Sequence, residues 1–190
     1  MQKFTFYRYR YSRGIPSLSV WGSATIRRKF DLVATGGTFD ELHVGHLALL
    51  SKAFEIGDKV IIGISSDDFA SRVKNKTKLN HNYEERVKNL RETIEKIFGR
   101  RVNYTIAKLD NEFGPTVTHG LVGALVSSSE TARKGKEINN IRRINHLKPI
   151  SIVAVDILKA EDGGPISSTR IRAGEIDASG KILKTPTKSK

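Results

Sequence analysis

The chain contains 190 residues, 38% of them apolar, which is enough to bury one core and too few for two comfortable domains. It contains no cysteine, so neither a disulfide framework nor a thiolate metal site is possible, and we expect a cytoplasmic protein. The sequence lacks a run of about 18 apolar residues and lacks an apolar signal core, so we expect neither a membrane span nor ordinary secretion.

The formal net charge of +13 suggests a nucleic-acid partner, but most of the excess lies near the two ends of the sequence. Residues 1–30 hold seven basic residues and residues 181–190 hold four, and neither stretch contains an acid. Residues 31–180 therefore hold 22 bases against 20 acids and are almost neutral. A nucleic-acid binder should show a basic face within its fold, so we do not expect a nucleic-acid partner.

Residues 1–29 combine aromatic side chains with arginines and show no clean period, so we predict a basic, disordered extension outside the fold. The alternatives for this stretch are a misplaced start codon, an organelle targeting peptide and a basic arm that binds a phosphate backbone. Residues 181–190 are similarly polar and are predicted to form a disordered basic tail. One folded domain is left between them, at residues 30–180.

From residue 30 onward, short runs rich in β-branched residues alternate with stretches in which apolar residues recur every three or four positions. The runs predict strands at 31–34, 60–64, 102–106, 121–126 and 150–155. The periodic stretches predict helices around 47–54, 87–97 and 138–147. Near-continuous apolar strands alternating with helices imply a mostly parallel sheet with both faces covered. We therefore expect a single-domain α/β fold of the Rossmann-like, doubly wound type, with ligands beyond the carboxyl ends of the strands where strand order reverses.

The first predicted strand runs into a segment that can bind an anion, with the sequence T-G-G-T-F-D-E-L-H-V-G-H at residues 35–46. Gly36 and Gly37 allow backbone N–H groups to approach a phosphate, and the following helix adds the partial positive charge of its N-terminus. The segment is neither a Walker loop nor a dinucleotide fingerprint, because G-x-x-x-x-G-K-[ST] and G-x-G-x-x-G are both absent. His43 and His46 flank Gly45 closely enough to face one ligand, and Gly45 is expected to leave room for a nucleotide.

Two histidines in a loop are often ordinary surface residues, but their position after a diglycine at a strand end favours ligand binding here. A zinc site at His43 and His46 would need a third ligand. The other histidines show no supporting spacing, and these are His81, His119 and His146. We therefore expect no metal ion held by the protein's own side chains.

A second segment, G-G-P-I-S-S-T-R-I-R at residues 163–172, follows the last predicted strand. Ser167 or Ser168 can cap a helix there and leave backbone N–H groups exposed. Hydroxyl groups and the Arg170 guanidinium can add charge-assisted hydrogen bonds to phosphate oxygens. Together with the first segment, this one predicts a phosphate clamp built from both ends of the domain.

These two segments carry a family resemblance. G-G-T-F-D-x-x-H-x-G-H followed about 120 residues later by I-S-S-T-R is similar to the nucleotidylyltransferase superfamily. Within it, residues 30–178 resemble the archaeal and eukaryotic branch of phosphopantetheine adenylyltransferase. The stretches that narrow the resemblance lie at 53–58, 83–86, 110–115, 126–131, 137–139 and 160–163. The resemblance implies adenylyl transfer from ATP, with Mg²⁺, to 4'-phosphopantetheine, which gives dephospho-coenzyme A and pyrophosphate in coenzyme A biosynthesis.

The resemblance also implies roles for individual residues. His46, at the last position of H-x-G-H, is expected to be the chief transition-state donor, with His43 assisting on the nucleotide phosphates and Thr38 holding the acceptor phosphate or the α-phosphate. The β- and γ-phosphates are expected to be held by Ser167, Ser168, Thr169 and Arg170. Further nucleotide contacts are expected from residues 129–133, from Gly36, Gly37 and Phe39, and, at the adenine or ribose, from Glu137. A lysine that grips the acceptor phosphate is expected after the second strand, and its spacing leaves three candidates, Lys74, Lys76 and Lys78.

The nearest alternative is a cytidylyltransferase acting on glycerol 3-phosphate or a similar phosphate acceptor, since those enzymes share G-T-F-D-x-x-H-x-G-H. Their C-terminal motif is usually I-S-T-T preceded by R-T-x-G, whereas residues 163–170 are G-G-P-I-S-S-T-R. A second alternative is a non-catalytic module that binds a nucleotide or nucleic acid. Such a module should have lost His46 or the I-S-S-T segment, and both are intact. The base preference and the oligomeric state stay open at this point.

Overall fold

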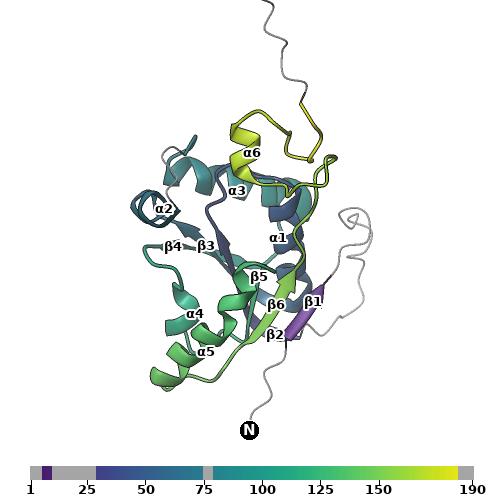
Figure 1. Ribbon diagram of the computed structural model, residues 1–190. Coiled ribbons are helices and arrows are strands. Elements are labelled where there is room, and N and C mark those ends of the chain that lie inside the picture. The colour runs from purple at the N-terminus through teal and green to yellow at the C-terminus, as the bar shows by residue number, and fades with distance from the viewer. Residues whose placement is uncertain (1–5, 10–28, 75–78, 184–190) are drawn as a thin grey trace, which may run out of the picture.

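The structure is a computed structural model and describes residues 6–9, 29–74 and 79–183, with the backbone alone for residues 6–9, 73 and 74 (Figure 1). Its strands are β1 (Phe6–Tyr9), β2 (Phe30–Gly37), β3 (Gly57–Ser65), β4 (Tyr104–Leu109), β5 (Ala124–Ser128) and β6 (Ser151–Val155). Its helices are α1 (Val44–Ile56), α2 (Asp67–Lys74), α3 (Tyr83–Phe98), α4 (Pro115–Thr118), the 3-10 helix η2 (Thr131–Lys134), α5 (Gly135–Ile144) and α6 (Ser168–Arg172). Within these residues, no helix has the length and apolar character needed to cross a bilayer.

The described strands form one parallel sheet in the order β1-β6-β5-β2-β3-β4. Along the chain, the sheet grows from β2 through β3 to β4 on one side, and through β5 and β6 on the other. Strand order therefore reverses between β2 and β5, and the carboxyl ends of these two strands flank the position where doubly wound folds bind ligands. This arrangement confirms the predicted Rossmann-like, doubly wound α/β fold.

Helices cover both faces of the sheet (Figure 1). On one face, Phe54 of α1 and Leu90 of α3 share a core cluster with Val33 of β2. On the other face, Ile138 of α5 shares a second cluster with Ala34 of β2 and with residues of α4 and η2. Successive strand residues point to opposite faces, so β2 contributes to both layers. Burying each large apolar side chain contributes about 1.5–3 kcal/mol, and the two layers together hold the carboxyl end of β2 in place.

Local signals set the ends of the helices. α3 begins at a capping box, in which the Asn82 Oδ1 accepts the Glu85 N–H at 3.0 Å and the Glu85 Oε2 accepts the Asn82 N–H at 2.8 Å. α5 ends because His146 adopts a φ of +55° and the Leu147 N–H donates to the Arg142 carbonyl at 2.8 Å. Leu147, which the apolar period placed in this helix, therefore lies beyond its end.

Two strands begin later than predicted. β4 begins at Tyr104 and β5 begins at Ala124, where the apolar runs suggested residues 102 and 121. Leu121 is 77% exposed and lies in a turn, where its N–H donates to the His119 ring at 3.3 Å. The Gly123 N–H then donates to the carbonyl of residue 32 in β2. Apolar character alone misplaced this boundary, because it does not separate a turn residue from a strand residue.

Segments near both ends of the predicted domain join the fold. β1 pairs with β6 from Phe6 opposite Ile152 to Tyr9 opposite Val155, so part of residues 1–29 is an edge strand and not an extension outside the fold. In the predicted tail, the carbonyl of residue 181 accepts the N–H of residue 177 at 2.9 Å, and residue 182 bridges to residue 176. Main-chain pairing holds both segments, and no side-chain period reveals such pairing over so few residues.

Candidate active site

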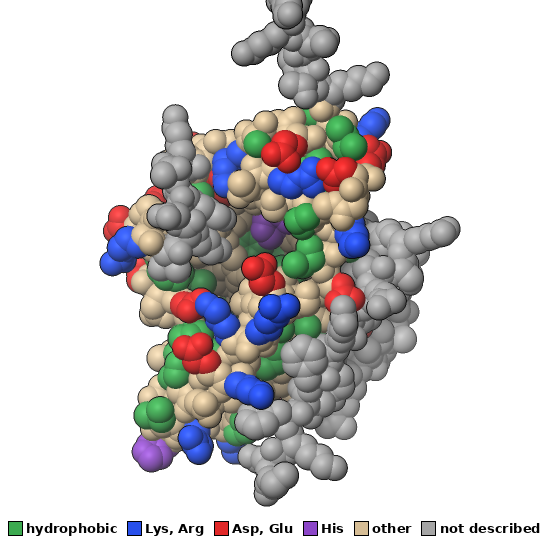
Figure 2. All heavy atoms as spheres, viewed as in Figure 1, with side chains coloured by type: hydrophobic (Ala, Val, Ile, Leu, Met, Phe, Trp, Pro, Cys, Tyr) green, Lys and Arg blue, Asp and Glu red, His purple; other side chains and the backbone are tan. Residues whose placement is uncertain are grey.

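Two cavities lie at the carboxyl ends of β2 and β5, where strand order reverses. The larger, of about 370 Å³, lies between the start of α1 and the segment that leads into α6. The smaller, of about 180 Å³, lies on the side of α4 and α5. Gly36, Gly37 and Thr131 line both, so ligands in the two cavities can meet at the diglycine. Figure 2 shows this face hollowed below α6, with a histidine side chain visible inside the hollow.

The larger cavity collects most of the residues that the sequence predicted for the nucleotide. These are Gly36, Gly37, Thr38, His43, His46, Ser167, Ser168 and Thr169. The region predicted to approach the nucleotide contributes Glu130 and Thr131. Sequence reasoning missed a further stretch after β6, at residues 156–158. The two motifs, far apart in the sequence, therefore line one cavity.

Close packing of the backbone explains the diglycine. A Cβ on Gly36 would lie 2.9 Å from the Gly63 carbonyl oxygen of the neighbouring strand, which is too close. The following turn places Phe39 at a φ of +53°, an unusual conformation for a bulky residue. The Phe39 ring is 1% exposed and lies against Gly37 and His46, with 4.9 Å between the Phe39 and His46 ring centroids. Phe39 was predicted to contact the nucleotide, but it lies outside the cavity lining and supports His46.

His43 and His46 begin helix α1 with stacked rings, whose centroids are 3.9 Å apart at an interplanar angle of 31°. His43 is the N-cap, and its Nδ1 accepts the Gly45 N–H at 3.1 Å. An accepting Nδ1 carries no proton, so neutral His43 carries its proton on Nε2. The Nε2–H group is then the donor that this ring can offer to a ligand oxygen.

Gly45 is required by the His43 ring. A Cβ at position 45 would lie 2.9 Å from both Cε1 and Nδ1 of His43. Any side chain there would push the ring off the N–H that it caps. The sequence suggested that Gly45 leaves room for a nucleotide, and the structure adds this closer constraint. The H-x-G-H spacing therefore encodes a helix cap as well as a pair of donors.

A fully buried arginine holds Thr38. Arg86 of α3 donates from Nη1 to the Thr38 carbonyl and from Nη2 to the Asp67 carboxylate, both at 2.7 Å. Asp67 also accepts the Tyr83 N–H at 3.0 Å, which ties the start of α2 to the start of α3. The Arg86 side chain is 0% exposed, and these partners make its buried charge tolerable. Arg86 was part of the sequence resemblance, but no motif or period predicted its contact to Thr38.

Asp40 links the segment at residues 35–46 (the first motif) to the segment at residues 163–172 (the second motif). Its carboxylate accepts the N–H groups of Asn80 and His81 at 3.2 and 3.0 Å, and it lies 3.3 Å from the His81 Nδ1. It also accepts the Arg172 Nη1 of α6 at 2.6 Å. Burial alone would raise the pKa of Asp40, which is 2% exposed, but these donors outweigh burial and hold the pKa below its ordinary value. Asp40 is therefore ionised at neutral pH and fastens α6 to the first motif.

The serines of the second motif are fixed by separate contacts. The Ser167 Oγ caps α6 by accepting the Arg170 N–H at 3.3 Å. The Ser168 Oγ donates to the Glu41 carbonyl at 3.1 Å, which is a second link between the motifs. Both residues line the larger cavity together with Thr169. The two segments are therefore linked and line one side of the cavity together.

Two residues that were predicted to bind the nucleotide, Arg170 and Glu137, lie outside the lining of the larger cavity. Arg170 pairs with Asp162 and donates from Nε to Glu175 at 2.7 Å, and these two carboxylates raise the pKa of Arg170 above its ordinary value. Its guanidinium braces the turn before α6 and does not line the cavity. Glu137 is exposed in the first turn of α5 and also lies outside the lining. Residue type alone could not separate groups that face a phosphate from groups that brace the wall.

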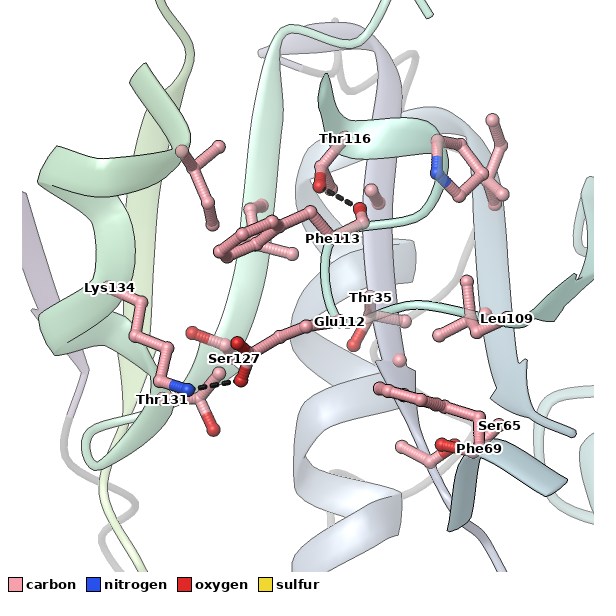
Figure 3. Close-up of a pocket in the computed structure, with 18 residues that line it drawn as sticks. Thr35, Ser65, Phe69, Leu109, Glu112, Phe113, Thr116, Ser127, Thr131 and Lys134 are labelled. Carbon is pink, nitrogen blue, oxygen red and sulfur yellow. Dashed lines mark hydrogen bonds and ion pairs between the residues drawn. The ribbon is translucent and has the colours of Figure 1, made fainter. Parts of the chain in front are cut away.

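The smaller cavity has mainly apolar walls, drawn in Figure 3. Alternate residues of three neighbouring strands form its floor, namely Ala34, Gly36, Ile61, Gly63, Ser65, Leu125 and Ser127. Leu109 and Phe113 lie at its sides, and Glu112 and Lys134 form an ion pair within its lining. The candidate lysines for the acceptor phosphate are not among these residues, because the side chains of Lys74, Lys76 and Lys78 lie outside the described part of the chain.

A second buried arginine, also missed from the sequence, fixes one wall of the smaller cavity. Arg142 is 0% exposed and donates to the carbonyls of Thr116, His119 and Lys148 at 2.5, 3.2 and 2.7 Å. Burial lowers the pKa of Arg142 from its ordinary value, but a guanidinium stays protonated in proteins. Thr116 lines the cavity, so Arg142 holds the wall through main-chain carbonyls.

Comparison with known proteins agrees with this geometry. Residues 34–174, more than half of the chain, match the family model described as cytidylyltransferase-like. A phosphopantetheine adenylyltransferase from Methanothermobacter thermautotrophicus is 43% identical over 84% of this chain and 93% of its own length. The Pyrococcus abyssi protein of the same name is 44% identical over 82% of this chain and 98% of its own length. Among solved structures, a protein of unknown function from Archaeoglobus fulgidus shares 29% identity with a TM-score of 0.59, covering 71% of this chain and 98% of that protein. The chain therefore belongs to the cytidylyltransferase-like nucleotidyltransferases and, within them, to the phosphopantetheine adenylyltransferase family.

Proposed function

We propose that the protein transfers the adenylyl group of ATP to the phosphate of 4'-phosphopantetheine, which gives dephospho-coenzyme A and pyrophosphate. The observation that supports this most directly is the pair of cavities that meet at Gly36 and Gly37. The larger carries histidines and hydroxyls suited to a triphosphate, and the smaller is a mainly apolar pocket suited to an uncharged arm. The acceptor phosphate then lies at their junction, next to the α-phosphate of the nucleotide.

In this reaction an oxygen of the acceptor phosphate attacks the α-phosphorus while the bond to the β-phosphate oxygen breaks and pyrophosphate leaves. Catalysis of such a step depends on positioning and on donors that neutralise charge on the phosphate oxygens. His46 and His43 supply such donors at the start of α1, where the helix N-terminus adds its partial positive charge. The transfer forms no covalent enzyme intermediate, so it requires no protein nucleophile.

The remaining phosphate contacts divide between the two motifs. Thr38, held by Arg86, faces the acceptor phosphate or the α-phosphate. Residues 167–169 face the β- and γ-phosphates from the opposite motif. Arg170 would have to leave both Asp162 and Glu175 to reach a phosphate, so we assign it to bracing this wall.

Mg²⁺ fits this site as a partner of ATP. Glu130 and Asp156 line the larger cavity, while the described residues contain no group of three or more His, Asp or Glu side chains that could hold a metal ion. Mg²⁺ commonly keeps several waters and binds through substrate phosphates with one or two carboxylates. We propose that Glu130 and Asp156 would face the Mg²⁺ ion that accompanies the ATP phosphates. The positive charge of that ion would stabilise the leaving pyrophosphate.

The acceptor phosphate also needs a cation, for which we propose one of three lysines, Lys74, Lys76 or Lys78. Described residues before and after this stretch contact the segment at residues 35–46, directly or through Arg86. Before it, Asp67 pairs with Arg86, which holds the first motif. After it, the Asp40 carboxylate accepts the His81 N–H. Both contacts bring described residues that flank this stretch to residues 35–46, which supports the proposal.

Pyrophosphate release by the purified protein with Mg²⁺ tests this function, with ATP and CTP each crossed against 4'-phosphopantetheine and glycerol 3-phosphate. Of these four pairs of substrates, we expect turnover only with ATP and 4'-phosphopantetheine. His46→Ala should lower kcat by about 100-fold or more, the usual loss of one transition-state donor. His119→Ala, at an exposed position outside both cavities, is the matched control and should behave as wild type. Turnover with CTP would identify a cytidylyltransferase, and no turnover with any pair would overturn the proposed substrate.

A further inference from the structure

The first turn of helix α1 is completed by a segment from the other end of the domain. The first four N–H groups of a helix have no partner within the helix. In α1, the His43 ring accepts the Gly45 N–H, and the His43 carbonyl accepts the next two N–H groups at 2.9 and 3.2 Å. The remaining N–H group belongs to Val44, and it donates to the Ala178 carbonyl at 3.1 Å.

This contact fixes the peptide group between His43 and Val44. Its N–H donates to Ala178, and its carbonyl accepts the N–H groups of the first helical turn. A peptide group is planar, so it cannot rotate without breaking hydrogen bonds on both sides. The orientation of this group sets the direction of the His43 ring and the path of the chain to His46.

A small apolar cluster holds the partner segment against α1. Residues 174–183, which we call the clasp, follow α6 and form the last described part of the chain (yellow in Figure 1). Ile176 of the clasp is 0% exposed and shares a cluster with Ile166, which lines the larger cavity. The side chain of Val44, at the variable position of H-x-G-H, packs against the same cluster. The clasp therefore contacts α1 through both a side chain and the main chain.

Asp177 shapes the turn that carries Ala178. Its Oδ1 accepts the Ser179 N–H at 2.8 Å, the Lys181 N–H at 3.0 Å and the Ser179 hydroxyl at 2.7 Å. Gly180 adopts a φ of +88° and donates its N–H to the Asp177 carbonyl at 3.0 Å. These donors, the Ser179 hydroxyl above all, hold the pKa of Asp177 below its ordinary value. Asp177 is therefore ionised at neutral pH and holds the turn closed.

We propose that Asp177 is a positioning residue for the adenylyl transfer. Its turn holds the Ala178 carbonyl against the Val44 N–H, and this contact sets the directions in which His43 and His46 offer their donors. The role rests on the proposed function, in which the two histidines neutralise charge on the phosphates. The clasp lies outside the linings of both cavities, so it acts on the reaction through α1.

Asp177→Ala and Asp177→Asn together test this role. All three side-chain contacts fall on one oxygen, and asparagine keeps an acceptor oxygen at that place. We expect Asp177→Ala to lower kcat about tenfold, because the histidine donors lose their alignment, and Asp177→Asn to keep kcat within about twofold of wild type. The KM for 4'-phosphopantetheine should change by less than about twofold in both variants, because the clasp lies outside the smaller cavity. Asp58→Ala, exposed at the start of β3, is the matched control.

Val44→Pro breaks the same contact from the other side. Proline has no N–H group and is tolerated at the first position of a helix. His43 already has the extended backbone that a residue before proline needs, with φ −144° and ψ 168°. We expect a similar loss of about tenfold in kcat. Because both changes remove one contact, Asp177→Ala combined with Val44→Pro should be slower than either single variant by less than about twofold.

Amide hydrogen exchange measures the contact without measuring activity. The Val44 N–H should exchange about tenfold faster in Asp177→Ala than in wild type, while the Leu50 N–H, in the middle of α1, should not change. An equal increase at Leu50, or losses in kcat that multiply in the double variant, would reduce Asp177 to a structural residue and overturn the positioning role. Wild-type kcat in folded Asp177→Ala would also overturn it.

Activity of the wild-type protein separates this role from the proposed function. If the wild type turns over a different nucleotide or acceptor, the proposed substrate fails, and the ratios of kcat on that pair test the clasp in the same way. If the wild type turns over no pair, the proposed function and the positioning role both fail.

Discussion

Replacing Arg86 by methionine should impair stability and catalysis together, because one guanidinium serves both. It makes two charge-assisted hydrogen bonds of 2.7 Å, to the Thr38 carbonyl and to the Asp67 carboxylate. Bonds to charged groups contribute about 1.5–3 kcal/mol each. The Asp67 side chain is 50% exposed and regains water when the arginine is lost, whereas Thr38 is 6% exposed and its carbonyl loses its partner. We therefore expect a loss of about 3 kcal/mol in the free energy of unfolding.

The same substitution should slow the reaction, because the Thr38 carbonyl loses the contact that fixes it at the junction of the cavities. A displacement of about 1 Å in a positioning group can lower the rate about 100-fold. We expect kcat/KM to fall by about that factor in protein that is still folded. Arg86→Lys should fall between wild type and Arg86→Met, since one ammonium cannot reach both partners with the geometry of a guanidinium.

Urea unfolding and steady-state kinetics on the same preparations measure both effects. Arg72→Met is the matched control, because Arg72 is exposed on α2 and contacts the Asp68 carbonyl at 3.2 Å. It should change stability by less than about 0.5 kcal/mol. If Arg86→Met unfolds at the same urea concentration as wild type and turns over at the same rate, then Arg86 neither stabilises the fold nor positions Thr38.

Three further changes probe other parts of the site. Gly45→Ala should lower kcat about tenfold or more in steady-state kinetics, because the new Cβ collides with the His43 ring, and a wild-type kcat would contradict this. Asp40→Asn should lower the free energy of unfolding at pH 7 by about 3 kcal/mol. The pKa of Asp40 is depressed in the folded state, so its contribution is lost as pH falls through that pKa, and urea unfolding should show the gap to wild type closing below about pH 4. Arg170→Ala should keep the Kd for a non-hydrolysable ATP analogue within about threefold of the wild-type value, because the ion pairs of Arg170 lie near the surface. A larger rise in Kd, measured by calorimetry, would show that Arg170 reaches the phosphates.

The fold could be predicted where its signals lie within single elements. The apolar run of β3 and the three-to-four-residue period of α3 are visible because their side chains are buried in the core. The parallel order follows from the alternation of strands and helices. β1 and the start of β5 could not be predicted in this way. β1 is defined by main-chain pairing with β6, and the residues before β5 form a turn with strand-like composition.

The site could be predicted where residue type matches ligand chemistry. The diglycine, the two histidines and residues 167–169 line one cavity as expected from their motifs. Phe39 and Arg170 belong to the same motifs but brace the walls. Asp40, Arg86 and Arg142 were missed because they bind backbone groups of segments that are distant in the sequence. The fold has to bring such segments together before these contacts are visible.

The proposed reaction is a direct transfer of the adenylyl group between two substrates that meet at the diglycine. A single turnover with excess protein, 4'-phosphopantetheine and ATP labelled at the α-phosphate tests it. We expect the label to move into dephospho-coenzyme A as pyrophosphate is released in equal amount, and we expect His46→Ala to slow this step. Label recovered as free AMP or bound to the protein would contradict it.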